Sequence, residues 1–288
     1  MVFICYGLLS VAAMPELPEV EVSRLGLLPF LTGQRIVNVI FRTPKLRHDL
    51  PAWLATRLTG LRVDAITRRG KYLLFDCEST AGGGWLILHL GMSGSLRLVK
   101  TGTPVQKHDH VDLVFAYTTL RFRDPRRFGT LLWHEGDDVV NHPLIAVLGI
   151  EPLSPVFDGD WLHAATRRRS APIKPLLMDS HLVVGIGNIY ASESLFRASI
   201  SPLRAAHRIS RERYRILVAA IRSTLATAIA AGGSSVRDYV HSDGGAGCFQ
   251  HSCAVYDRHG EPCPSCEQPV HCVRQAGRST FYCQRCQR

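Results

Sequence analysis

The sequence has no long hydrophobic run and few acidic residues in its second part. No apolar stretch of the 288 residues approaches the roughly 18–20 that a transmembrane helix requires, so no integral membrane segment is expected. Residues 1–160 hold 17 basic and 16 acidic side chains, whereas residues 161–288 hold 17 and 8. The excess positive charge therefore lies almost wholly in residues 161–288. It favours nucleic acid as a partner over an anionic membrane, and simple solubility is the alternative.

Two further absences exclude particular fold classes. No repeat of 20–50 residues is present, which argues against solenoids and propellers. Gly185-Ile186-Gly187-Asn188 does not continue into a dinucleotide-binding motif and follows no βαβ pattern. It predicts instead a turn entering a helix, where main-chain N–H groups and the Asn188 amide can hold a phosphate.

Residues 1–13 lack both Lys and Arg. A secretory signal has a basic start and usually a longer hydrophobic stretch, so we favour another interpretation. Residues 1–13 are expected to be a mis-annotated or processed extension, with translation beginning at Met14.

Hydrophobic patterning predicts an α+β protein of two domains. Apolar residues recur with helical spacing from Pro18 to Leu31, and Thr32-Gly33 supplies a stop. A second short helix is expected over 50–58. Short runs separated by turn formers then predict an antiparallel β-sandwich or barrel. The expected strands are 35–41, 61–65, 72–77, 85–90, 95–99, 111–116, 120–123 and 130–133.

Prolines interrupt both periodicities near residues 149–160, and helical periodicity dominates afterwards. The expected helices are 161–169, 172–178, 188–197 and 210–231. The predicted organisation is an extension at 1–13, a catalytic β-sandwich domain at 14–149, a linker at 150–160, a helical domain at 161–247 and a cysteine-rich finger at 248–288.

The cysteines at the end of the chain have the spacing of a zinc ribbon. Two C-x2-C pairs, Cys263 with Cys266 and Cys283 with Cys286, are separated by sixteen residues, enough for a β-hairpin. Four thiolates leave no open coordination position, so the zinc is predicted to be structural. Disulfides are the alternative, but the cysteine count of 9 is odd. The other five are expected to be free thiols: Cys5, Cys77, Cys248, Cys253 and Cys272.

A proline follows Met14 directly, and carboxylates surround it. If Pro15 is the first residue of the mature chain, its amine has a pKa near 8 and is partly unprotonated at neutral pH. A secondary amine can attack a sugar anomeric carbon to give an iminium, and Glu16 could shuttle the protons. Taken alone, a proline here is more commonly just the first residue of a helix.

Six further motifs accompany the Pro15–Glu16 segment along the chain. With the motif of that segment first, the order is PELPEVE at 15–21, RRGKYLL at 68–74, HLGMSGSL at 89–96, KHDHVDL at 107–113, DPRRFG at 124–129, VVGIGNIYASESLF at 183–196 and the terminal ribbon. Together they resemble the formamidopyrimidine-DNA glycosylase (Fpg, MutM) family. The resemblance implies a β-sandwich with an N-terminal helix, a helix-two-turn-helix domain and a zinc finger. It implies excision of 8-oxoguanine and formamidopyrimidines from duplex DNA, followed by β- and δ-elimination.

The resemblance also implies catalytic roles. Pro15 matches the Schiff-base nucleophile, Glu16 the general acid and Glu19 a supporting carboxylate. Lys71 matches a lysine that assists β-elimination, and Arg278 an arginine linked to δ-elimination. The alternatives are an exposed hairpin cation for Lys71 and a plain phosphate contact for Arg278.

Reaching a damaged base requires flipping it from the stack, and the gap must be filled. By resemblance Met92, Arg126 and Phe128 fill it, although on spacing alone Met92 and Phe128 would more often be core residues. The residues implied to contact DNA are His108, Arg126, Arg169, Lys174 and Asn188. A metal at His108-Asp109-His110 is not expected, because a third ligand is missing.

The expected partner is damaged double-stranded DNA, with one structural zinc ion, no organic cofactor and no membrane. A monomer in the cytoplasm is expected, associated with the nucleoid when bound to DNA. Two alternatives stay open. One is an endonuclease VIII-like enzyme for oxidised pyrimidines, against which Leu17 argues because that branch commonly has glycine there. The other is a catalytically inactive DNA-binding relative, should Pro15 not be N-terminal.

Overall fold

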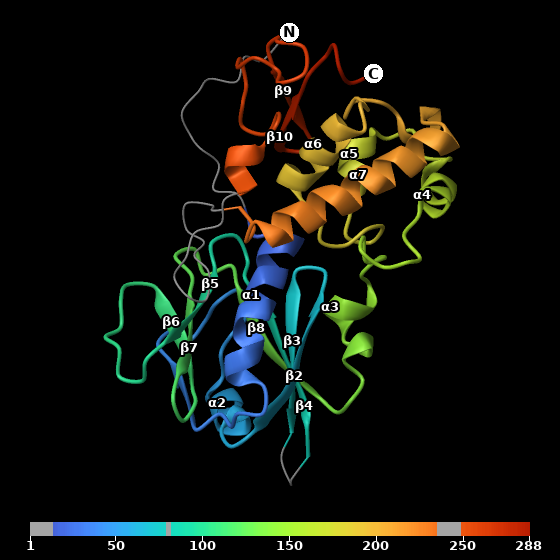
Figure 1. Ribbon diagram of the computed structural model, residues 1–288. Coiled ribbons are helices and arrows are strands. Elements are labelled where there is room, and N and C mark those ends of the chain that lie inside the picture. Colours follow the sequence, from blue (N-terminus) through green and yellow to red (C-terminus); the bar gives the residue numbers. More distant parts are fainter. Residues whose placement is uncertain (1–13, 79–81, 235–248) are drawn as a thin grey trace. The chain divides into compact units, whose positions relative to one another are not determined.

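The structure is a computed structural model that describes residues 14–78, 82–234 and 249–288 (Figure 1). The chain divides into two compact units. Among the described residues, the first unit holds 14–147 and 229–234, and the second holds 148–228 and 249–288. The predicted extension at 1–13 lies outside the described residues.

The first unit begins with helix α1, Leu17–Leu31, which confirms the helix predicted from the apolar spacing. Pro18 lies in its first turn, where the missing N–H has no intrahelical partner to lose. The helix ends at Leu31 with Thr32 as its C-cap, and the following Gly33 has a φ of +79°, a left-handed conformation that glycine adopts at little cost.

Two antiparallel four-stranded sheets follow, in the orders β1-β6-β7-β5 and β2-β3-β4-β8. Helix α2, Ala52–Leu58, lies between the first two strands in the sequence, and the short α3, Pro143–Ala146, follows the last. The strands are β1 Asn38–Phe41, β2 Arg62–Arg69, β3 Tyr72–Glu78, β4 Gly84–His89, β5 Ser95–Val99, β6 Asp109–Val114, β7 Thr119–Arg123 and β8 Thr130–Glu135.

One hydrophobic core joins α1 to both sheets. Leu27 and Leu31 of α1 are fully buried with Phe75 and Leu86 of one sheet and Phe122 of the other. Figure 1 shows α1 lying along the sheets of this unit. Burying the inner faces of two sheets against each other is the basis of a β-sandwich, and the predicted fold class is confirmed.

The second unit is helical, and the predicted helices are confirmed with shifts of a few residues at their ends. They are α4 Gly159–Thr166, α5 Ile173–Leu177, α6 Asn188–Arg197 and α7 Arg211–Ala230. The segment predicted as a linker is held within this unit, since the Arg222 guanidinium donates to the carbonyls of Ser154 at 2.5 Å and Phe157 at 2.8 Å.

The same unit ends in an antiparallel hairpin of β9, His271–Gln275, and β10, Arg278–Tyr282. Its turn contains Ala276 and Gly277, both with positive φ. The hairpin lies between the two cysteine pairs, as the sixteen-residue spacing predicted.

Some element ends differ from the prediction. Strand β2 runs to Arg69 rather than Ala65, because the polar residues Thr67–Arg69 pair with β3 in the hairpin. Helix α2 starts at Ala52, since Pro51 is its N-cap residue. The four-residue α3 was not predicted.

Candidate functional site

The predicted catalytic pair lies at the start of α1. Pro15 is buried immediately before the helix, and Glu16 is the N-cap residue with only 3% of its surface exposed. Glu19, three residues later, accepts the Glu16 N–H at 2.8 Å. This bond belongs to a capping box, an arrangement that satisfies N–H groups that the helix start leaves unpaired. The fixed backbone limits where the Glu16 carboxylate can lie.

A residue that the sequence did not indicate also binds Glu19. The other oxygen of the fully buried Glu19 carboxylate accepts the N–H of Ser234 at 2.8 Å and its hydroxyl at 2.9 Å. Ser234 is 215 positions away, so no local pattern could have revealed it. It belongs to the same compact unit as α1.

Lys71 lies in the turn between β2 and β3, where Gly70 has a φ of +57°. This hairpin is tied to α1 by Arg68, whose guanidinium donates to Glu21 at 2.8 Å. Burial raises the pKa of Glu21, but hydrogen bonds from Arg24 and Arg68 outweigh it and leave the pKa below its usual range. The ionised Glu21 therefore joins the element that carries Lys71 to the helix that carries Glu16.

The three predicted insertion residues lie on two neighbouring loops. Met92 is half-buried in the turn between β4 and β5, while Arg126 and Phe128 are in the loop between β7 and β8. Phe128 is 44% exposed, and the Arg126 guanidinium lies 4.9 Å from its ring centroid. Phe128 is therefore not a core residue, and its ring is available to contact another molecule.

His108 lies beside these loops. Its φ is +76°, and its carbonyl accepts the Asp124 N–H at 3.0 Å. His110 contacts the Asp124 carbonyl through Nε2, also at 3.0 Å. Within the described residues the only group of three or more His, Cys, Asp or Glu suited to a metal is the cysteine cluster, so His108 and His110 join no such group.

The predicted DNA contacts of the second unit differ in exposure. Arg169 is exposed just after α4. Lys174 is 1% exposed, and its ammonium donates to Asn188 at 2.6 Å, to the Ser279 carbonyl at 3.1 Å and to the Thr280 hydroxyl at 2.8 Å. The structure thus brings Lys174 of α5 and Asn188 of α6 together beside β10, and Lys174, predicted to contact DNA, is buried.

Arg278 is exposed at the start of β10. It borders a cavity of about 220 Å³ that is also lined by Lys174 and Gln275. Both the tip of the hairpin and the first turn of α6 therefore adjoin Lys174.

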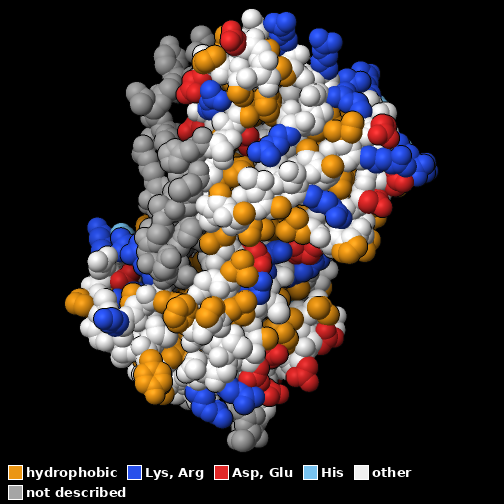
Figure 2. All heavy atoms as spheres, in the orientation of Figure 1, with side chains coloured by type: hydrophobic (Ala, Val, Ile, Leu, Met, Phe, Trp, Pro, Cys, Tyr) orange, Lys and Arg blue, Asp and Glu red, His pale blue; other side chains and the backbone are white. Residues whose placement is uncertain are grey.

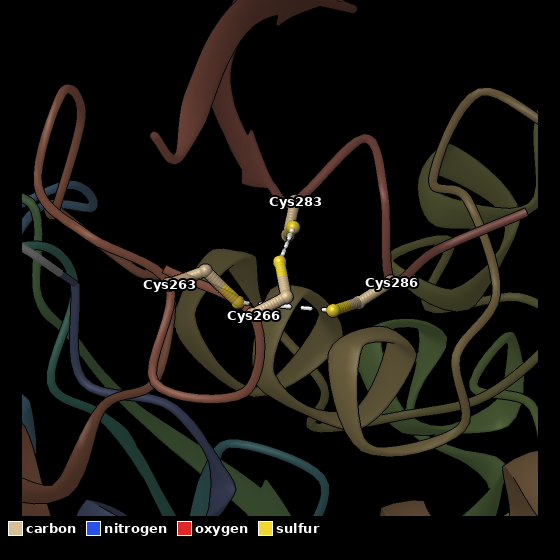
Figure 3. A group of neighbouring side chains, drawn as sticks. All are labelled: Cys263, Cys266, Cys283 and Cys286. Carbon is tan, nitrogen blue, oxygen red and sulfur yellow. Dashed lines mark hydrogen bonds between the residues drawn. The ribbon is translucent and has the colours of Figure 1, made fainter. Parts of the chain in front are cut away.

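The four predicted metal ligands converge. Figure 3 shows their sulfurs turned toward one another, and all four lie within 4.8 Å. The Cys263–Cys286 distance is 3.9 Å and the Cys266–Cys283 distance 3.4 Å. A tetrahedral ion with Zn–S bonds of about 2.3 Å separates its sulfurs by roughly 3.8 Å. The donor set fits a zinc ion.

Two buried polar residues that the sequence did not single out support the finger. Glu193 of α6 is fully buried, and its carboxylate accepts the N–H groups of Ala254, Val255 and Tyr256 at 2.8–3.0 Å. Gln287 accepts the Cys283 N–H and donates to the Ile200 carbonyl, each at 2.9 Å. These bonds attach the segments around the cysteines to the helical part of the same unit.

Positive charge is visible on the second unit. On the face drawn in Figure 2, Lys and Arg side chains gather over α4 and the first turns of α7. Part of that charge is neutralised, because Asp160 pairs with Arg211 at 2.7 Å and with Arg215 at 3.1 Å. Hydrogen bonds from these two arginines hold the pKa of Asp160 far below its usual range.

No helix in the described part of the chain combines the length and apolarity needed to cross a membrane. A β-sandwich unit and a helical unit with a four-cysteine cluster that could hold a metal ion define the chain as a two-unit protein with a candidate metal-binding finger. Three family models match it. They are the formamidopyrimidine-DNA glycosylase N-terminal domain at 14–131, its H2TH domain at 148–240 and the zinc finger found in FPG and IleRS at 260–288.

Relatives match over nearly the whole chain. Formamidopyrimidine-DNA glycosylase of Dechloromonas aromatica is 65% identical over 276 residues, covering 95% of this chain and 100% of the relative. The crystal structure of MutM (Fpg) from Thermus thermophilus is 41% identical with a TM-score of 0.83, covering 95% of this chain and 98% of that one. Wild-type Lactococcus lactis Fpg (MutM) in complex with a DNA containing N7-benzyl-Fapy-dG is 35% identical with a TM-score of 0.87, covering 95% and 99%. The chain belongs to the formamidopyrimidine-DNA glycosylase family.

Proposed function

We propose that this protein is a DNA glycosylase of base excision repair that removes oxidised purines, 8-oxoguanine and formamidopyrimidines, from double-stranded DNA. The observation that carries the proposal is the family match across the sandwich, the helical domain and the finger. The Lactococcus lactis relative bound to DNA containing N7-benzyl-Fapy-dG supports the substrate class.

Pro15 is the proposed nucleophile once the residues before it are removed. Its neutral amine would attack C1′ of the damaged nucleotide, and the base would leave with the amine proton, so that C1′ carries both the Pro15 nitrogen and O4′. Cleavage of the C1′–O4′ bond, with a proton delivered to O4′, would then open the sugar ring and give an iminium between Pro15 and C1′. The buried Glu16, next to Pro15, is the proposed group that moves protons during this exchange. An amine already bonded to a preceding residue is an amide and cannot react in this way.

We further propose AP lyase activity. Loss of a proton from C2′ of the iminium would expel the 3′ phosphate, and a second elimination would expel the 5′ phosphate. Lys71, on the hairpin held to α1 through Arg68 and Glu21, is assigned to the first elimination. Arg278, exposed at the tip of the finger hairpin, is assigned to the second.

DNA binding is assigned to the remaining predicted residues. Met92, Arg126 and Phe128 would fill the space left by the flipped nucleotide. The backbone contacts are His108, Arg126, Arg169, Lys174 and Asn188. The four cysteines would hold one structural zinc ion, and no organic cofactor is proposed. A monomer acting in the cytoplasm at the nucleoid completes the proposal.

A matched pair of proteins tests the chemistry: the chain beginning at Pro15 and the full 288-residue chain. Both are incubated with a duplex containing 8-oxoguanine in the presence of borohydride, which reduces an iminium to a stable bond. A covalent adduct is expected only from the chain whose Pro15 is free, and its peptide mass should carry the sugar. Lack of an adduct from the chain beginning at Pro15 overturns the proposal. The N-terminal mass of the native protein then shows which form exists.

The alternatives give different outcomes in the same assay. A strong preference for a duplex containing thymine glycol would favour the endonuclease VIII-like activity. Salt-sensitive DNA binding without any adduct would favour a non-catalytic binding protein.

A further inference from the structure

A buried carboxylate lies between the two loops that carry Met92, Arg126 and Phe128. Asp124, at the end of β7, is fully buried, and Ser93, next to Met92, is 2% exposed. The Ser93 hydroxyl donates to Asp124 Oδ1 at 2.6 Å. This bond links the turn between β4 and β5 with the loop between β7 and β8.

The same two side chains hold the second loop in shape. Asp124 Oδ2 accepts the Gly129 N–H at 2.7 Å, while Oδ1 also accepts the Arg126 N–H at 3.2 Å. The Arg126 N–H lies 3.1 Å from the Ser93 oxygen as well. Asp124 and Ser93 therefore bind the backbone on both sides of Phe128, and Ser93 belongs to the other loop.

Close backbone packing accompanies these bonds. A Cβ added at Gly91 would lie 2.5 Å from the Phe128 carbonyl carbon and 2.6 Å from the Gly129 nitrogen. Gly91 also has a φ of +69°, which disfavours a side chain for a second reason. The backbone before Met92 thus lies directly against the backbone of Phe128 and Gly129.

We propose that Ser93 and Asp124 are positioning residues that join Met92, Arg126 and Phe128 into one preassembled wedge. The proposal rests on the proposed function, in which these three side chains enter the DNA. A wedge assembled in advance loses less conformational entropy on insertion than three separately mobile side chains. Asp124 would act through its hydrogen bonds, without contacting the DNA.

The first experiment uses the protein without DNA and compares Ser93→Ala with Ser95→Ala. Ser95 is two residues away and fully buried, and its hydroxyl has no hydrogen-bond partner within the described residues. Losing a hydrogen bond to a charged group should speed local opening by about tenfold. We expect amides in both 91–94 and 126–129 to exchange with deuterium about tenfold faster in Ser93→Ala, with no change in Ser95→Ala. Unchanged exchange in 126–129 of Ser93→Ala would overturn the coupling of the two loops.

The second experiment is a double-mutant cycle on excision. Single-turnover rates on an 8-oxoguanine duplex are measured for wild type, Ser93→Ala, Met92→Ala and the double variant. If Ser93 acts by placing Met92 together with Arg126 and Phe128, Ser93→Ala slows excision in the wild-type background and costs less in the Met92→Ala background, because one of the three side chains is already absent. Multiplying losses, or wild-type excision by Ser93→Ala, would overturn the proposal.

The two experiments distinguish a failure of this inference from a failure of the proposed function. A wild-type protein that does not excise 8-oxoguanine overturns the proposed function, and the exchange experiment still decides whether the loops are coupled. Asp124→Asn is a second variant for both arms. The Asn side chain has one oxygen in place of two, so it cannot accept from Ser93, Arg126 and Gly129 at the same time. A larger effect than that of Ser93→Ala is therefore expected.

Discussion

The Glu19 carboxylate of α1 holds Ser234 through both its backbone and its side chain, with N–H and hydroxyl distances of 2.8 and 2.9 Å. The same carboxylate binds the Glu16 N–H at 2.8 Å, so one buried group fixes two parts of the first unit. Gly233, which precedes Ser234, has a φ of +77°, and a Cβ at this glycine would lie 3.0 Å from Glu19 Oε1. Glu19 therefore fixes the backbone at Glu16 and at Ser234.

Replacing Glu19 with Gln tests this support. The variant keeps the shape but turns one oxygen into an N–H donor, which opposes the N–H of either Glu16 or Ser234. Leaving a buried donor unpaired should lower the free energy of unfolding by about 1–3 kcal/mol. The yield of the borohydride adduct should fall as well, because the backbone of Glu16 loses its anchor. Urea unfolding and adduct yield measure the two effects.

Glu212→Gln is the matched control, since that carboxylate is 72% exposed. Both quantities should stay at wild-type values. Equal behaviour of the Glu19 and Glu212 variants would show that the bonds to Glu19 do not support the site.

A second prediction concerns pH. Burial, with the nearby charges of Lys71 and Arg47, lowers the pKa of His89 to about 4. Its Nδ1 accepts the Gly91 N–H at 2.9 Å, and its ring lies 4.7 Å from that of Tyr72. In the unfolded chain a histidine has a pKa near 6.5, so between pH 6.5 and 4 the unfolded state binds a proton that the folded state does not. The stability contributed by the neutral ring is present above pH 6.5 and is lost as the pH falls towards 4.

The measurement is urea unfolding of wild type and His89→Gln at pH 7.5 and 4.5. Lowering the pH should destabilise wild type more than the variant, by up to about 3 kcal/mol. His181→Gln, at a side chain that is 71% exposed, should show little such difference. A pH dependence unaffected by His89→Gln would contradict the assignment.

The sequence predicted the order of helices and strands because each one buries a periodic set of apolar residues. It misplaced element ends where polar residues decide them, as at Arg69, whose pairing with Tyr72 extends β2. At the candidate site, the motifs predicted roles for Glu16, Met92 and Phe128 by position, and these roles stay predictions. The bonds from Glu19 to Ser234 and from Ser93 to Asp124 join residues 215 and 31 positions apart, and no periodicity encodes such pairs.

Lys174 illustrates the same limit and gives a third prediction. Its buried ammonium has partners on α6 and β10. Lys174→Met therefore removes the lysine donor from Asn188 Oδ1 and from the Thr280 hydroxyl, and one of the two donors of the Ser279 carbonyl. We expect a loss of about 2 kcal/mol in stability together with weaker DNA binding. Arg169→Met, at an exposed position, should leave stability unchanged and reduce the slope of log binding constant against log salt by about 1.

Thermal unfolding and binding titrations at several salt concentrations distinguish the two variants. If Lys174→Met changed only the salt slope, the lysine would act as a surface phosphate contact despite its burial. If Arg169→Met left the slope unchanged, Arg169 would not contact a phosphate.

The fourth prediction concerns the cysteine cluster. Because the four thiols repel as thiolates unless a cation lies between them, metal binding should supply much of the folding energy of the finger. Cys283 and Cys263 belong to its small core with Val255, Val270 and Phe281, so losing the ion should loosen that core. Cys266→Ser should bind less than one zinc per chain, and its β9–β10 amides should lose protection from hydrogen exchange. Because the finger carries Arg278, the variant should also bind DNA at least tenfold more weakly. Cys272→Ser changes a sulfur outside the cluster and should keep one zinc per chain by atomic absorption. Full zinc content and unchanged β9–β10 protection in Cys266→Ser would contradict the prediction that a metal bound by this cluster stabilises the finger.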